Sequence, residues 1–406
     1  MSELSYLEKL LDGVVVEWKT LEDISIKISS GGTPKTGVSE FYDGDIPWLR
    51  TQEVNFCDIW DTEVKITESG VKNSSAKWIP KNCVIVAMYG ATVGKIGINK
   101  IPMTTNQACA NIQLNEEVAH YRYVFHFLCS QYTYIKSLGT GSQTNINAQI
   151  VKNIKIPIPC PENPEKSLAI QSEIVRILDT FSALTAELTA ELNMRKKQYN
   201  YYRDQLLSFK EGEVEWKTLG EVAQYSKTRI SFELLDERNY VGVDNLLQNR
   251  AGKSLSNHVP TSGKLTEFIP NDILIGNIRP YLKKIWQADC IGGTNGDVLV
   301  IRCIDSSINT RYLYQILADD KFFEYNMQHA KGAKMPRGSK EDIMKYPIPV
   351  PPLTLQARIV EILNKFDTLT NSITEGLPRE IELRQKQYEY YRDLLFSFPK
   401  PETVSN

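Results

Sequence analysis

The sequence lacks long apolar runs and the pattern of a signal peptide. Its longest apolar stretch, near Cys83 to Met88, is far shorter than the roughly 20 residues that a membrane helix needs. The N-terminal residues MSELSYLEKLLDG do not follow the basic-then-apolar order of a signal peptide. We therefore expect a cytoplasmic protein.

Cysteine and histidine are few and scattered. No C-x-x-C pair occurs, so neither a disulfide framework nor a zinc site is predicted, and we expect reduced, mostly buried thiols. No histidine has a zinc-like or nucleophile–base spacing, so we expect the histidines to be structural. The residues concerned are Cys57, Cys83, Cys109, Cys129, Cys160, Cys290 and Cys303, and His120, His126, His258 and His329.

Catalytic motifs are also missing. An adenine methyltransferase needs a D/N-P-P-Y/F tetrapeptide, and none occurs. The run from Gly90 to Lys95 resembles a phosphate-binding loop, but it has one residue too few between its glycines and places Ile96 where Ser or Thr should hold magnesium. We therefore expect a non-catalytic chain.

Charge of one sign is not in excess, because the net charge is only −2. Lysine and arginine number 14 against 13 acidic residues over 14–155, and 18 against 16 over 214–346. Non-specific affinity for DNA rests mainly on phosphate neutralisation. Binding of this chain to a polyanion must therefore come from local basic patches or from basic partner chains.

What the chain does have is an internal repeat. RKKQYNYYRDQLLSF, from Arg195, and RQKQYEYYRDLLFSF, from Arg384, share eleven of fifteen residues, and VEWKTL begins at both Val16 and Val214. Identities of this length at a spacing near 190 residues indicate tandem duplication of one unit. The segments between the repeated phrases differ, which suggests one scaffold that presents two recognition surfaces.

The duplication predicts an α+β fold with two mixed domains. Short β-rich runs and a helix near Tyr121 to Tyr134 predict the first domain over 16–158, and prolines at 157, 159, 161 and 164 predict an extended hinge at its end. A second mixed domain is predicted over 214–346. The remaining segments are a helical tail over 1–15 that closes the repeat, a central helix over 159–213 and a C-terminal helix over 347–406.

Both helical segments follow a heptad pattern. From about Ser167 to Phe209, alternating steps of four and three connect eleven positions, nine of them apolar or aromatic. The second copy carries the breaker GLP at 376–378, so we expect it to kink or split. The two stripes are expected to pack together as long antiparallel coiled-coil helices with one globular domain at each end.

The first helix also contains the doubled unit TAELTAEL at 185–192. With about 1.5 Å per residue, the helix is expected to be roughly 60 Å long, and one unit more or less changes it by about 6 Å and about 40°. We hypothesise that the copy number sets the spacing between two recognised DNA half-sites. The alternative is an ordinary solvated helix with a coincidental repeat.

This order of segments resembles the specificity subunit of type I restriction-modification systems, and most of all its IC-type branch. The resemblance covers the whole chain and rests on the IPIP phrase, the two KQYxYYRD helices, GGTP at Gly31, DIPWLRTQEV at Asp45 and GAKMPRGSKEDI at Gly332. It implies a non-catalytic subunit that chooses a bipartite, asymmetric DNA target, with one half for each domain.

The same resemblance implies the partners. Double-stranded DNA, two modification (adenine methyltransferase) subunits and the restriction subunits are expected to assemble with this chain. It implies that no cofactor is bound here, with S-adenosylmethionine, ATP and magnesium expected on the partner subunits.

Two parallel hairpins are the first candidate DNA contacts. WIPKNCVIVAMYGATVGKIGI, from Trp78, and FIPNDILIGNIRPYLKKIWQA, from Phe268, both predict a strand, a polar loop and a strand. A shared frame with unlike side chains suits sequence readout, because base edges differ in their donors and acceptors. The candidate residues are Tyr89, Thr92, Lys95, Asn277, Arg279, Tyr281, Lys283 and Lys284.

Two polar runs near the domain ends compete for the same role. The run at 139–149 is rich in amides, which pair with adenine edges, and the run at 329–340 is basic, which suits phosphate or guanine. The candidates are Ser142, Gln143, Asn145, Asn147, Lys331, Lys334, Arg337 and Lys340. For every loop residue, a solvated surface position is the alternative.

The repeated YYRD phrases predict a docking surface for partner chains. Tyrosine and arginine are enriched in protein interfaces, so equivalent exposed copies fit two copies of a modification subunit. The residues expected to project away from the helix seam are Tyr201, Arg203, Tyr390 and Arg392. The residues expected to pack within it are Tyr199, Tyr202, Tyr388 and Tyr391.

Two other classes of function remain as alternatives. One is a non-catalytic coiled-coil adaptor that joins proteins without sequence-selective DNA binding. The other, a restriction–methylation enzyme in a single chain, is disfavoured because no catalytic motif occurs.

Overall fold

The computed structural model describes residues 13–139, 145–210, 212–372 and 374–398. The chain forms two compact units, one of residues 1–184 and 384–406 and the other of residues 185–383. Unit 1 and unit 2, as we name them, therefore each combine one globular domain with parts of the repeated helical segments. Most of the predicted N-terminal tail lies outside the described residues.

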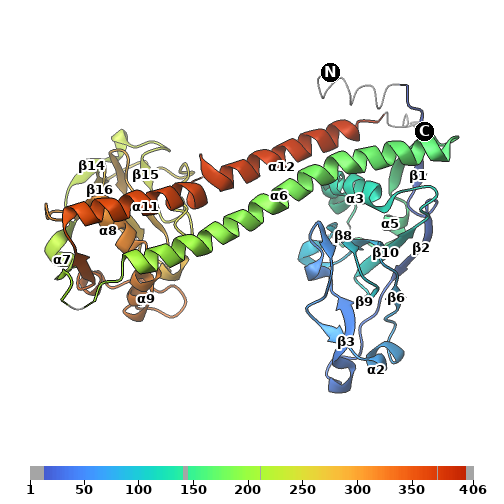
Figure 1. The fold of residues 1–406 in the computed structure, drawn as a ribbon, viewed down its shortest axis with the longest axis horizontal. Coiled ribbons are helices and arrows are strands. Elements are labelled where there is room, and N and C mark those ends of the chain that lie inside the picture. Colours follow the sequence, from blue (N-terminus) through green and yellow to red (C-terminus); the bar gives the residue numbers. More distant parts are fainter. Residues whose placement is uncertain (1–12, 140–144, 211, 373, 399–406) are drawn as a thin grey trace. The chain divides into compact units, whose positions relative to one another are not determined.

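The globular domain of unit 1 is built on three sheets (Figure 1). A five-stranded sheet has the order β2-β10-β7-β8-β4, a four-stranded sheet has the order β5-β3-β9-β6, and β1 pairs with β11. The strands are β1 Val16–Thr20, β2 Ser25–Ser30, β3 Tyr42–Leu49, β4 Cys57–Ile59, β5 Lys65–Ile66, β6 Trp78–Ile79, β7 Val84–Ala87, β8 Ile96–Asn99, β9 Met103–Thr105, β10 Cys109–Leu114 and β11 Lys155–Pro159. The helices are α2 Glu68–Lys72, α3 Tyr121–Ser130, α4 Tyr132–Ser137 and α5 Ala148–Lys152.

The globular domain of unit 2 repeats this plan. Its sheets have the orders β13-β20-β17-β18 and β14-β16-β19-β15, and β12 pairs with β21. The strands are β12 Glu215–Thr218, β13 Ala223–Tyr225, β14 Arg229–Ser231, β15 Tyr240–Val241, β16 Lys264–Phe268, β17 Ile273–Gly276, β18 Ile285–Gln287, β19 Gly292–Thr294, β20 Val298–Cys303 and β21 Pro347–Val350. The helices are α7 Leu219–Val222, α8 Thr310–Leu317, α9 Asp320–Gln328 and α10 Lys340–Ile343.

The predicted hairpins are confirmed, and they occupy equivalent places in the two domains. β7 pairs with β8 and β10 in unit 1, and β17 pairs with β18 and β20 in unit 2, all antiparallel. Each second sheet also contains one parallel pair, β3 with β9 and β15 with β19. The duplication therefore preserved the sheet frame although the sequences between the repeats differ.

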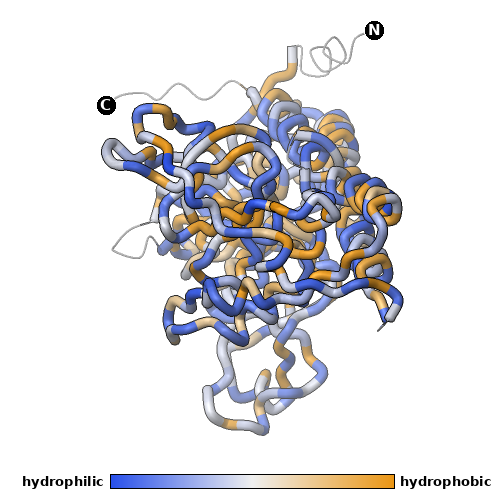
Figure 2. The backbone as a smooth tube through the Cα atoms, turned by 90° about the vertical axis from the view of Figure 1, so that its left-hand side faces the viewer, coloured by the Kyte–Doolittle hydropathy of each residue, from blue (hydrophilic) through white to orange (hydrophobic). Residues whose placement is uncertain are grey.

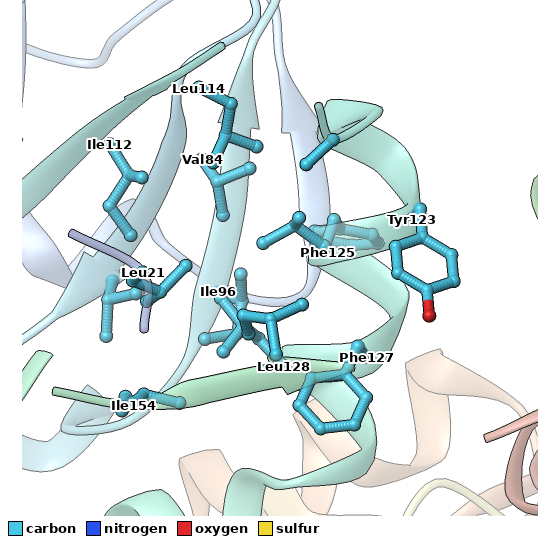
Figure 3. Packing of buried hydrophobic residues seen from close by; sticks show 14 of the residues in the cluster. Leu21, Val84, Ile96, Ile112, Leu114, Tyr123, Phe125, Phe127, Leu128 and Ile154 are labelled. Atoms are coloured by element: carbon cyan, nitrogen blue, oxygen red, sulfur yellow. The ribbon is translucent and has the colours of Figure 1, made fainter. Parts of the chain in front are cut away.

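The main core of unit 1 lies between the five-stranded sheet and α3. Val84 and Ile112 of the sheet and Leu128 of α3 are fully buried. Figure 3 shows side chains from the strands and from α3 filling the space between them. Burial of each such aliphatic side chain contributes about 1.5–3 kcal/mol to folding, so this layer fixes the hairpin that carries the first candidate contacts.

The Pro-rich segment is not the hinge that we predicted. β11 pairs with β1 in register, Trp18 opposite Pro157 and Glu17 opposite Ile158. Ile156 and Ile158 are buried, and the Tyr123 hydroxyl donates to the Pro157 carbonyl at 2.7 Å. Among the described residues β11 pairs with β1 alone, and prolines are tolerated on such edges because their missing N–H is not needed there.

The central helix α6 extends over Pro164–Leu206 as one continuous element. It begins three residues before the predicted start, at Pro164. Proline suits the first helical turn because its φ is already helical and because it has no N–H that would be left unpaired there. The second copy splits, as predicted, into α11 Leu353–Asn371 and α12 Gly376–Leu395. Gly376 has φ +76° and lies against the Thr368 carbonyl, where a side chain does not fit.

The heptad stripe packs as predicted within each unit. In unit 1, Phe181 of α6 stacks on Tyr391 of α12 with ring centroids 5.1 Å apart. In unit 2, Phe366 of α11 stacks on Tyr199 and Tyr202 of α6 at 5.8 and 5.5 Å. Hydrophilic and hydrophobic residues alternate along the helices in Figure 2, as expected for helices with one buried face. Within the described residues, no helix combines the length and apolarity needed to cross a bilayer.

A polar joint fixes the globular domain of unit 1 to its helices. Arg122 of α3 donates to Asp179 of α6 at 2.7 Å and to Asp58 at 3.0 Å. The buried His126 ring lies between Asp179, 2.7 Å from Nε2, and the Tyr388 hydroxyl, 3.0 Å from Nδ1. Burial lowers the pKa of His126. Burial alone raises the pKa of Asp179, but the hydrogen bonds from His126 and Arg122 outweigh it and the net pKa is lowered.

Unit 2 has the equivalent joint with different chemistry. Arg311 of α8 donates to Asn364 and Asp367 of α11, both at 2.6 Å. The Tyr199 hydroxyl of α6 donates to Gln315 at 3.0 Å, where unit 1 holds a histidine. The duplicated frame therefore docks each domain at corresponding places, and only the joint of unit 1 contains a histidine.

Candidate nucleic-acid interface

In the first domain the hairpin loop turns through a short 3-10 helix, Gly90–Thr92, between β7 and β8. Gly90 and Gly94 adopt φ +82° and +80°, which favour glycine. Tyr89 is exposed. The Thr92 hydroxyl donates to the Thr51 carbonyl at 2.8 Å, so this side chain is already engaged.

Lys95 is anchored beside the same loop. Its ammonium donates to Asn55 Oδ1 at 2.8 Å and lies 6.0 Å from the centroid of the Phe56 ring. The loop thus offers one exposed aromatic side chain, Tyr89, and one half-exposed cation held by a neighbouring segment.

The described end of the amide-rich run, residues 145–149, lies directly against this loop. The backbone N–H of Ile146 donates to the Met88 carbonyl at 3.0 Å. Asn147 caps α5 by accepting from Ile150 N at 2.9 Å, so its oxygen is committed to the helix. Asn145 Oδ1 is buried with no hydrogen-bond partner. The candidates Ser142 and Gln143 lie outside the described residues.

In the second domain the loop between β17 and β18 contains two residues with left-handed backbone, Arg279 at φ +53° and Lys283 at φ +51°. Tyr281 between them is exposed. Lys283 forms an ion pair with Asp320 at 2.7 Å. The loop is therefore held in an uncommon conformation by its surroundings, a condition that concentrates at ligand-binding sites.

Two of the predicted loop contacts are not on the surface. Lys284 is buried and its ammonium donates to the Val243 carbonyl, and burial lowers its pKa. Asn277 is only 6% exposed. The sequence predicts both as candidate contacts of a polar loop, but Lys284 turns inward just before strand β18, and the segment at 336–338 covers Asn277.

The basic run of the second domain covers the loop in the same way. Arg279 N donates to the Pro336 carbonyl at 2.7 Å, and Gly338 N donates to the Asn277 carbonyl at 3.2 Å. Arg337 forms an ion pair with Asp297 at 2.9 Å. The predicted basic residues that are exposed are Lys331, Lys334, Arg337 and Lys340. The loop and the polar run, which we treated as competitors, form one surface in each domain.

A third segment of this surface was missed by sequence reasoning. Phe56 has φ +54° and its N–H donates to the Ile96 carbonyl at 2.7 Å. In unit 2, Asn249 and Arg250 have φ +55° and +65° and donate to the carbonyls of Leu282 and Lys283. Positive φ is rare for phenylalanine and arginine, so the sequence held no signal for it at Phe56 and Arg250.

The predicted docking residues divide into exposed tyrosines and covered arginines. Tyr201 and Tyr390 are 60% and 56% exposed. Arg203 is only 3% exposed, lies 4.2 Å from the centroid of Tyr199 and donates to the Ala318 carbonyl at 3.4 Å. The predicted exposure of Arg203 is therefore wrong, because the globular domain covers that face of α6.

Arg392, the equivalent residue in the second repeat, is also largely covered. Its side chain is 17% exposed, pairs with Asp393 at 2.8 Å and lies 5.7 Å from the Tyr388 ring. At these four positions the exposed side chains are therefore the tyrosines rather than the arginines.

The cysteines agree with the prediction only in part. All seven are free thiols, but only Cys83 and Cys109 are buried, so the prediction that most are buried is wrong. Burial raises the pKa of both of these thiols to about 12, which disfavours the reactive thiolate. Among the described residues, no group of three or more histidine, cysteine and acidic side chains is arranged to hold a metal ion.

Comparison with known proteins gives a consistent family. The model of the type I restriction modification DNA specificity domain matches residues 15–195 and 211–383. The specificity subunit of the type I restriction enzyme EcoR124I/EcoR124II of Escherichia coli is 41% identical over 419 residues, which cover 100% of both chains. The specificity subunit of the Escherichia coli enzyme EcoprrI is 36% identical and covers 92% of this chain and 93% of its own length.

A solved structure shares the fold. The S subunit of the type I restriction-modification system of M. genitalium superposes with a TM-score of 0.60 at 16% identity, and the match covers 96% of this chain and 98% of that chain. The two matched segments together span most of the sequence and coincide with the two halves of the internal repeat. The chain belongs to the family of type I restriction-modification DNA specificity subunits.

Proposed function

We propose that this chain selects the DNA target of a type I restriction-modification complex and that each globular domain reads one half of a bipartite, asymmetric sequence. The observation that carries the proposal is the pair of equivalent surfaces. Both domains place a hairpin loop, a polar run and a strained turn on the same sheet frame, with different side chains in each. Equal frames with unequal donors and acceptors fit two docking sites for two different base sequences.

The side chains divide between base and phosphate contacts. Exposed Tyr89 and Tyr281 lie in the two hairpin loops, where they can reach base edges or backbone. The exposed cations Lys331, Lys334 and Arg337 suit phosphates, because lysine and arginine neutralise the backbone charge. Positioning by phosphates and discrimination by base edges are separate tasks in protein–DNA recognition.

The chemistry belongs to partner subunits in this proposal. The exposed Tyr201 and Tyr390 occupy equivalent positions of the two repeats, which suits two copies of one modification subunit because a repeated surface binds a repeated partner. Restriction subunits join through the same complex. S-adenosylmethionine, ATP and magnesium are then held by those partners, and this chain contributes sequence choice and assembly.

Methylation mapping tests the proposal. The chain is expressed with and without a cognate modification subunit in a host that lacks other adenine methylation, and methylated adenines are located across the genome. We expect a new split motif that appears only when both chains are present. A stable complex that methylates nothing, or that methylates without sequence preference, would favour the adaptor alternative.

A further inference from the structure

Buried polar atoms without hydrogen-bond partners gather in the second domain beneath the segment at 331–338. Asn277 Oδ1, Arg279 Nε and both side-chain polar atoms of Asn326 have no hydrogen-bond partner. Asn326 is 0% exposed and Asn277 is 6% exposed. Buried amides are nearly always paired in folded proteins, so a group of such atoms requires an explanation.

The two amides point at one place. If Gly338 had a Cβ atom, it would lie 2.2 Å from Asn326 Oδ1 and 2.8 Å from Asn277 Oδ1. Because Gly338 has no side chain, the segment that contains it can lie directly on the two amide oxygens. The two amide oxygens therefore face the Cα atom of Gly338, which cannot donate an N–H or O–H hydrogen bond to them.

The segment at 331–338 that covers the amides has few anchors. Its backbone is attached to the hairpin loop by the bonds Arg279 N to Pro336 O and Gly338 N to Asn277 O. Its Arg337 forms an ion pair with Asp297 in which both side chains are at least 33% exposed, and exposed pairs contribute little. Lys331 and Lys334 stay exposed on the same segment, so DNA phosphates attract it as a whole.

The chemistry of Asn326 matches one base. An asparagine amide offers an acceptor oxygen and a donor NH2 group side by side, and adenine presents the complementary N6 amine and N7 in the major groove. Both groups of Asn326 are unused in the protein. One adenine edge satisfies both groups together.

We propose that Asn326 is a specificity-determining residue of the second domain, and that its amide reads the major-groove edge of one adenine after the segment at 331–338 has moved aside. Asn277 supplies a second acceptor next to it. This inference rests on the proposed function and deepens it by naming the base and the residue that selects it. It also assigns a role to α9, which sequence reasoning did not include in the site.

Two variants test the assignment by methylation mapping. Asn326→Leu keeps the approximate volume and removes both polar atoms, and Gln328→Leu, which changes an exposed amide of the same helix, is the matched control. We expect Asn326→Leu to lose the requirement for one adenine in one half of the motif, with the other half unchanged, and Gln328→Leu to keep the full motif. An unchanged motif in Asn326→Leu would overturn the inference and leave Asn326 as a site for ordered water.

Base-analogue duplexes give a second readout that needs no variant. Replacing each adenine of the same half-site by 7-deazaadenine removes the N7 acceptor, and we expect one position to weaken binding of the wild-type complex by about 10-fold. Asn326→Asp, which has no amide donor, should show no such sensitivity. If 7-deazaadenine weakens binding of the wild-type complex at no position, this inference fails while the proposed function stands. If the wild-type complex has no split motif at all, the proposed function fails with it.

Discussion

The joint that fixes the first domain to its helices should depend on one carboxylate. Asp179 accepts from Arg122 at 2.7 Å and lies 2.7 Å from His126 Nε2. Hydrogen bonds to charged groups contribute about 1.5–3 kcal/mol each. The Asp179 side chain is 31% exposed, so water replaces part of what Asp179→Ala removes, and we expect a net loss of about 2 kcal/mol.

Hydrogen exchange in the assembled complex measures this loss locally. Because about 1.4 kcal/mol corresponds to a tenfold change, amides of α3 should exchange roughly 30-fold faster in Asp179→Ala, while amides of α8 keep their rates. The matched control is Asn364→Ala at the equivalent place in unit 2, where Arg311 retains Asp367. There we expect about 1 kcal/mol. Unchanged α3 exchange, or a larger effect of Asn364→Ala, would refute the reasoning.

Three further predictions follow from the same structure. Burial lowers the pKa of His126, so its neutral form stabilises the joint fully above about pH 6.5, and this stability is lost as the pH falls toward the folded pKa. His126→Gln, which copies Gln315 of unit 2, should abolish this loss. Equal melting curves of variant and wild type at both pH 5.5 and 7.5 would contradict the prediction. Insertion of a third TAEL after residue 192 lengthens the continuous helix by about 6 Å and rotates its far end by about 40°. Methylation mapping should then show a longer spacer between unchanged half-sites. An unchanged spacer would mean that the repeat is a coincidence. Lys334→Ala should weaken binding to all DNA sequences alike and reduce the slope of affinity against salt concentration by about 1; a change of motif with an unchanged slope would argue against a phosphate contact.

The elements of the fold were predictable where local patterns decide them. The hairpins followed from apolar runs interrupted by glycine, and the split between α11 and α12 followed from the GLP breaker. The Pro-rich phrase misled because proline is compatible with an edge strand, and only the partner strand β1 reveals that β11 is one. Strand pairing between distant segments is not visible in the local sequence.

The candidate site was predictable in place but not in exposure. The heptad identified the seam of α6, yet it could not show that the globular domain covers Arg203 on the neighbouring face. Lys284 and Asn277 lie in a polar loop sequence but are covered by residues far along the chain. The left-handed turns at Phe56 and Arg250 have no sequence signature because their strain is imposed by tertiary contacts.

The central claim is that each domain reads its own half of the target. Its most direct test replaces residues 219–346, between the paired strands β12 and β21, with the corresponding segment of the Escherichia coli relative that is 41% identical. Methylation mapping of the chimaera should show one half of the motif replaced, with the other half and the spacer retained. A motif in which both halves change, or in which neither changes, would contradict the claim.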